Sequence, residues 1–202
     1  MPYAGRWGRQ NRNVHPIEAN LDLVQAMLGE AQDYLASPEV YWPLSGSPAY
    51  PRLTLGGLIL AMDELRASEP RMDSRLAAAW SRLRTQWDTL RAQRAAGVAR
   101  KAALELHSRL DLWDAYLGDL RESAGASGEY ATQVAYRVMA DPLADLARGE
   151  ASLPGLLTRL SGLDDRLRGR FTAGSFVWDP VLQPVYPRTE FWFLYGHPRE
   201  QV

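Results

Sequence analysis

The sequence of 202 residues contains no cysteine. This absence excludes disulfide frameworks, cysteine nucleophiles and zinc sites built on thiolates. Long hydrophobic runs are also missing, because the best apolar window, Leu53 to Met62, covers about half of the ~20 residues that a transmembrane helix needs. The N-terminal stretch MPYAGRWGRQNRNVHP lacks the apolar core of a secretory signal peptide. We therefore expect a cytoplasmic protein without membrane contact.

A strong charge of one sign is absent as well, since 23 Lys and Arg residues face 24 Asp and Glu residues. The total charge therefore does not favour nucleic acid as a partner. Motifs for phosphate loops, dinucleotide binding, nucleophile elbows and zinc proteases do not occur. The three histidines, His15, His107 and His197, lie far apart along the chain. The sequence thus offers no catalytic residue, no metal site and no cofactor site, and it favours a protein that is not an enzyme.

The sequence does have apolar residues that recur at helical intervals of three and four. We call each such row of apolar residues along one helix face a seam. One such seam follows Pro16, and a second begins after Thr54, which suits the N-cap position of a helix. Gly56 and Gly57 in that first turn suggest the close approach of another backbone. Further seams cross residues 130–138 and 153–167, and Asp141-Pro142 reads as the start of a new helical turn. The fold class that follows is all-α, an antiparallel bundle of five to six helices.

Two long seams between residues 72 and 122 leave an ambiguity. The first comprises Leu76, Trp80, Leu83, Trp87 and Leu90, and the second comprises Leu106, Leu110, Trp113, Leu117 and Leu120. On one straight helix the two seams would lie roughly 160° apart, on nearly opposite sides. We therefore expect a hairpin of two antiparallel helices with its turn near Gly97, and the alternative is one long helix. Residues 66–109 are mainly basic and residues 110–150 mainly acidic, so the hairpin would place a basic helix against an acidic one.

The two ends of the chain differ from this helical pattern. Residues 1–15 are rich in Arg, Gly and Asn and predict a flexible basic arm, which precedes a single helical domain over residues 16–202. Residues 171–202 carry four prolines and many aromatic side chains, and they predict an extended C-terminal strap packed on the helices. The stretch TEFWFLYG, residues 189–196, is the best strand candidate and could form a short β-hairpin.

Carboxylates along the helices are expected to be solvated. His107, Asp111 and Asp114 share one helical face beside a seam, where a weak contact across one turn is the usual outcome. Asp164 and Asp165 are adjacent, so their side chains diverge by roughly 100° and cannot act together on one atom. Both sets predict helix surface.

Six aromatic residues in proline-rich segments are the candidate contacts for a ligand or partner. They are Tyr41, Trp42 and Tyr50 in the 37–53 loop, and Trp178, Trp192 and Tyr195 in the strap. They either cap the end of the bundle or line an aromatic pocket between the loop and the strap.

Three hypotheses for function follow. The first is a noncatalytic interaction or scaffold protein, with a protein partner or self-association as a homodimer through a helix face. The second is the binding of a small apolar or aromatic molecule, or catalysis, in the pocket between the loop and the strap. The third is the binding of nucleic acid or another polyanion through the arm and the 66–109 helix.

Overall fold

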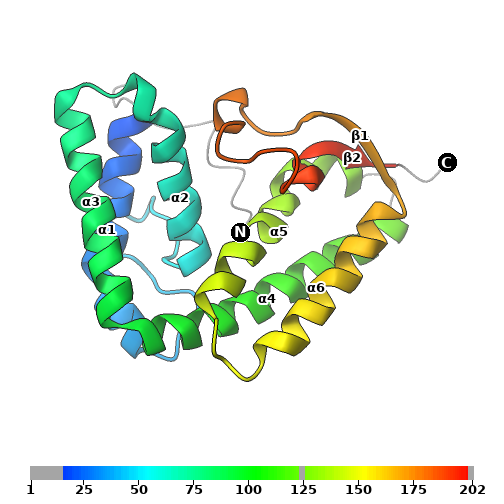
Figure 1. The fold of residues 1–202 in the computed structure, drawn as a ribbon, viewed down its shortest axis with the longest axis horizontal. Helices are drawn as coiled ribbons and strands as arrows, with labels where there is room; N and C mark the ends of the chain where they lie inside the picture. The colour runs from blue at the N-terminus through cyan, green and yellow to red at the C-terminus, as the bar shows by residue number, and fades with distance from the viewer. Residues whose placement is uncertain (1–15, 123–125, 200–202) are drawn as a thin grey trace.

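The computed structural model describes residues 16–122 and 126–199 and places six α-helices and one small sheet among them (Figure 1). The helices are α1 (Pro16–Ala36), α2 (Leu55–Ser68), α3 (Ser74–Gln93), α4 (Ala95–Glu122), α5 (Tyr130–Leu146) and α6 (Leu153–Arg168). The strands are β1 (Phe171–Phe176) and β2 (Tyr195–Pro198), and the short 3₁₀ helices are η2 (Glu69–Arg71), η3 (Ala126–Glu129), η4 (Pro180–Leu182) and η5 (Trp192–Leu194). The predicted all-α bundle with a short C-terminal hairpin is confirmed. The predicted arm at residues 1–15 lies outside the described residues.

The apolar seams form the core of the bundle. Both long seams predicted between residues 72 and 122 are buried along their whole length, including Trp80, Trp87 and Trp113. Thr54 caps α2 as predicted, because its hydroxyl accepts the N–H of Gly57 at 3.0 Å. A Cβ at Gly56 would lie 2.7 Å from the sulfur of Met139, so α2 and α5 approach more closely than a side chain there would permit.

The helices form two groups, and α2 contacts helices of both. In Figure 1, α1, α2 and α3 lie side by side on one side of the molecule, and α4, α5 and α6 lie on the other. Helix α1 packs against α2 and α3, while α4 packs against α5 and α6. Helix α2 joins the two groups because it also packs against α4 and α5.

The expected hairpin near Gly97 is wrong, and so is the single straight helix. The chain bends at Arg94, whose φ and ψ of −119° and 29° interrupt the helix, and α4 then runs away from α3 instead of back along it. Backbone hydrogen bonds cross the bend, from Arg94 N–H to Leu90 and from Val98 N–H to Arg94, each at 2.9 Å. The rotation between the two seams explains the outcome, because it directs α3 to α1 and α4 to α5 and α6.

The pairing of a basic helix with an acidic one is wrong for the same reason. Asp111 and Asp114 on α4 instead form ion pairs with α6: Arg159 donates to Asp111 at 2.6 Å and to Asp114 at 3.1 Å. Arg166 also pairs with Asp114. The weak contact predicted between His107 and Asp111 is present at 3.5 Å.

Asp164 is not the solvated surface residue that the sequence suggested. It is 7% exposed and accepts two hydrogen bonds from Arg137 of α5, at 2.7 and 2.9 Å. The guanidinium of Arg137 also lies 4.4 Å from the ring centre of Phe193 in the strap and pairs with Asp141. Helix α5 continues through Pro142, so the predicted new turn at Asp141-Pro142 is wrong; the missing N–H costs only one bond near the end of the helix.

The strap folds back over α5 and α2. Strand β1 pairs with β2 in an antiparallel hairpin, but Trp192–Leu194 form a 3₁₀ turn, so only the end of the predicted strand at 189–196 is extended. Tyr130 of α5 donates its hydroxyl to the carbonyl of Phe193, and Tyr186 donates to Asp63 of α2 at 2.9 Å. Polar tips and buried rings together fix the strap on the helices, as expected of aromatic anchors.

Among the helices in the described residues, none combines the length and the hydropathy that crossing a membrane would require.

Candidate functional site

Two of the three predicted aromatic residues of the 37–53 loop contact α1 and α4. The hydroxyl of Tyr41 shares a hydrogen bond of 2.7 Å with Ser108 of α4. The indole N–H of Trp42 donates to Glu30 of α1 at 2.7 Å. Tyr50 is half-buried against the core. These contacts hold the loop on the helices.

The three predicted residues of the strap have comparable contacts elsewhere in the molecule. Trp178 donates to the carbonyl of Ala131 at 2.7 Å, and Tyr195 donates to a backbone carbonyl within the strap at 2.8 Å. The guanidinium of Arg168 lies over the ring of Trp192 at 4.7 Å. Among the described residues, no hydrogen bond or ring contact joins this group to the loop residues. The aromatic pocket between loop and strap stays a prediction.

A buried polar ladder on α4, formed by Lys101, Glu105 and Arg109, is a feature that the sequence reasoning missed. All three side chains are buried, and they are spaced by four residues, so they share one face of the helix. The spacing of four residues was visible in the sequence. Because charged side chains are rarely buried, it suggested an exposed helix face instead of a buried one.

Lys101, the only lysine of the chain, lies at the end of the ladder beside the end of α1. Its ammonium donates to the carbonyls of Ser37 and Glu39, both at 2.7 Å, and lies 4.6 Å from the ring centre of Tyr34. Burial, together with the positive charge of Arg100, lowers the pKa of Lys101. The lysine therefore fixes the chain where it leaves α1.

Glu105 and Arg109 form the other part of the ladder. The carboxylate of Glu105 accepts the N–H of Gly56 at 3.2 Å and two N–H groups of Arg109 at 3.1 and 2.8 Å. Arg109 also donates to the hydroxyl of Thr54 at 3.0 Å. A negative charge at the N-terminus of α2 is favourable, so the pair locks α2 against α4. The charges of Glu105 and Arg109 are therefore paired with each other inside the protein.

A half-buried polar cluster lies where the strap meets α2. Glu64 accepts a hydrogen bond of 2.7 Å from Asn20 of α1, and Asp63 accepts the hydroxyl of Tyr186. The pKa of Glu64 is raised to about 8, mainly by burial, with smaller contributions from the negative charges of Asp63 and Asp179 and an opposing effect of the hydrogen bond from Asn20. Glu64 therefore keeps its proton near neutral pH in the folded protein.

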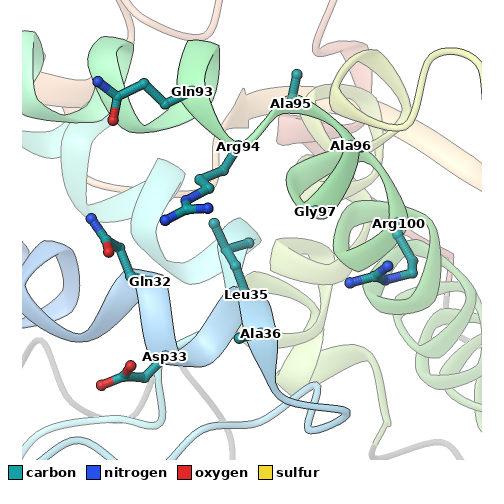
Figure 2. A pocket seen from close by; sticks show the side chains of 10 residues that line it. All are labelled: Gln32, Asp33, Leu35, Ala36, Gln93, Arg94, Ala95, Ala96, Gly97 and Arg100. Carbon is teal, nitrogen blue, oxygen red and sulfur yellow. The ribbon is translucent and has the colours of Figure 1, made fainter.

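An open groove lies at the corner between α3 and α4, beside the end of α1 (Figure 2). Its volume is about 500 Å³, and Leu35, Ala36 and Gly97 form its apolar floor. A Cβ at Gly97 would lie 3.9 Å from the Cβ of Leu35, so α4 begins close to the end of α1. The bend at Arg94 thus creates the groove, which we call the corner groove.

Polar side chains surround this floor. Gln32 and Gln93 line the groove from α1 and α3, and Arg94 and Arg100 line it from the bend and from α4. Figure 2 shows both guanidinium groups turned toward the space over Leu35, from opposite sides. The groove therefore presents two fixed positive charges beside amides and an apolar surface.

Arg94 and Arg100 have no side-chain or ring partner among the described residues. Apart from Arg82, each of the other arginines whose side chains the structure describes has a hydrogen bond, an ion pair, a ring contact or another electrostatic partner. Asp33 also lines the groove, but Figure 2 shows its carboxylate pointing away from both guanidinium groups. Of the three described arginines without a partner, Arg82, Arg94 and Arg100, the last two line the same groove.

The sequence could not reveal this arrangement. It identified Gly97 as a turn and Arg94 as a residue of the last helical turn, but the approach of α1 to the bend depends on tertiary packing. No family model, curated protein or solved structure matches the chain. The corner groove is therefore interpreted from its own chemistry.

Proposed function

We propose that this chain is a noncatalytic interaction protein that holds a segment of a partner protein in the corner groove. The observation that carries the proposal is the pair of partnerless guanidinium groups, Arg94 and Arg100, turned into one open groove. Arginine stays protonated at all relevant pH values, and glutamine amides do not titrate. Such a lining binds and orients a ligand but does not transfer protons, which supports binding over acid–base catalysis.

The open form of the groove supports a polypeptide over a small molecule. Ala36, Arg94, Ala95 and Arg100 are all exposed, so a small ligand would keep much of its surface in water. Small-molecule sites usually bury most of the ligand. A chain segment can lie across the groove and continue onto α1 and α4 on either side.

Filling the groove tests this proposal. Ala36→Trp places a large side chain on the groove floor at an exposed position, and the matched control Ala78→Trp adds the same side chain on α3 outside the lining residues. The three proteins are immobilised and exposed to a lysate of the organism that encodes the chain, and retained proteins are quantified by mass spectrometry. We expect a partner that the wild type and Ala78→Trp retain and that Ala36→Trp loses.

Thermal melts of the three proteins separate folding from binding, since all three should unfold at similar temperatures. If every protein retained by the wild type is retained equally by Ala36→Trp, the corner groove is not the binding surface and the proposal is wrong.

A further inference from the structure

We propose that the partner segment is acidic, with carboxylates placed against Arg94 and Arg100 and an aliphatic side chain against Leu35 and Ala36. This inference rests on the proposed function and adds the chemistry of the ligand.

The two arginines of the corner groove have unused hydrogen-bonding capacity. Each guanidinium has five N–H donors in a planar fork that matches a carboxylate. Most arginines of the described chain use these donors internally, and ion pairs such as Arg159 with Asp111 show the carboxylate pairing at 2.6 Å. Arg94 and Arg100 lack such a partner in the described chain, so their donors remain for a ligand.

The charges of Arg94 and Arg100 also favour an acidic ligand. Two cations that face the same groove repel each other, and an anion between them removes that repulsion. An acidic segment would complement this field, whereas a basic segment would add to the repulsion.

The lining of the corner groove combines apolar and polar side chains. The apolar floor at Leu35, Ala36 and Gly97 can bury part of an aliphatic side chain. Gln32 and Gln93 each supply an amide that can hydrogen-bond the backbone of a bound segment. A segment with carboxylates and one leucine-like side chain uses all three kinds of surface.

Nucleic acid fits the same charges less well. Along α3 the basic side chains other than Arg82 are neutralised, because Arg75 pairs with Glu18, Arg84 with Glu69, and Arg91 with Asp88. A phosphate backbone needs a longer run of free cations than the groove supplies. The short, partly apolar groove favours a polypeptide.

Fluorescence anisotropy with defined probes tests the inference. The first probe is a fluorescein-labelled decapeptide composed of glutamate, leucine and alanine, with the glutamates and leucines in alternation and alanine at the remaining positions. The second probe has the same sequence with glutamine in place of every glutamate. A third probe is a labelled single-stranded oligonucleotide of similar length. The proteins are the wild type, Arg94→Glu, Arg100→Glu and the control Arg82→Glu, which reverses the charge of the third partnerless arginine outside the groove.

The wild type should bind the glutamate peptide, and added salt should weaken that binding. Each groove variant should lose at least about tenfold in affinity, while Arg82→Glu should stay within about twofold of the wild type. The glutamine twin should bind at least about tenfold more weakly than the glutamate peptide.

Three results would overturn the inference. If neither peptide binds, or if the glutamine twin binds as well as the glutamate peptide, the ligand is not an acidic segment. If the oligonucleotide binds more tightly and the groove variants lose it, the site recognises polyanions. A partner captured from lysate and lost on Ala36→Trp would still support the proposed function, so the two failures are distinguishable.

Discussion

Replacing Glu105 by alanine is expected to lower the free energy of unfolding by about 3–5 kcal/mol. The carboxylate is fully buried and holds both Arg109 and the N–H of Gly56. Without it, the buried guanidinium of Arg109 loses the carboxylate that accepts two of its N–H groups, and the N-terminus of α2 loses its anionic partner. Urea denaturation followed by circular dichroism measures the loss.

Two further variants make this result specific. Asp119→Ala removes an exposed carboxylate from the same helix and should change the stability by less than about 0.5 kcal/mol. Combining Glu105→Ala with Arg109→Met removes both charges, so the double variant should be more stable than Glu105→Ala alone. If Glu105→Ala unfolds at the same urea concentration as the wild type, the buried pair does not stabilise the contact between α2 and α4.

Replacing Glu64 by glutamine is expected to stabilise the protein above pH 8 by about 2–4 kcal/mol. Burial, together with the smaller effects of Asp63 and Asp179, raises the pKa of Glu64 from its ordinary 4.5 to about 8. Between these two pH values the folded chain keeps a proton that the unfolded chain releases, so the stability of the wild type falls as the pH rises. Glutamine keeps an acceptor for Asn20 and carries no charge.

Denaturation from pH 5 to pH 9 measures the difference between the two proteins. The curves should nearly coincide at pH 5 and separate as the pH approaches 9. Asp63 also has a raised pKa, mainly through burial, so the wild-type curve alone does not isolate Glu64, but the difference does. A difference that stays constant with pH would contradict the account of this cluster.

Periodicity predicted the helical core because burial of one face is a local property of each helix. Leu76 to Leu90 and Leu106 to Leu120 recur at helical intervals, and both seams are buried. The same pattern did not predict the bend at Arg94. It gave the rotation between the seams but not which helices each seam would meet.

Buried charges were the part of the molecule that sequence reasoning missed most. Asp164 and Glu105 resemble surface carboxylates in the sequence, and only their arginine partners on other helices make burial favourable. These partners lie near each other only after the chain has folded. The same holds for the corner groove. Arg94 and Arg100 differ from nearly all the other described arginines in having no partner, and the sequence does not show which arginines have one.

The most direct test of an acidic partner in the corner groove is a charge exchange. The double variant Arg94→Glu/Arg100→Glu and the wild type are each titrated with the glutamate decapeptide and with a lysine twin, and the affinities are measured by anisotropy. The account predicts that the wild type prefers the glutamate peptide and that the double variant prefers the lysine peptide. The same order of preference in both proteins would contradict it.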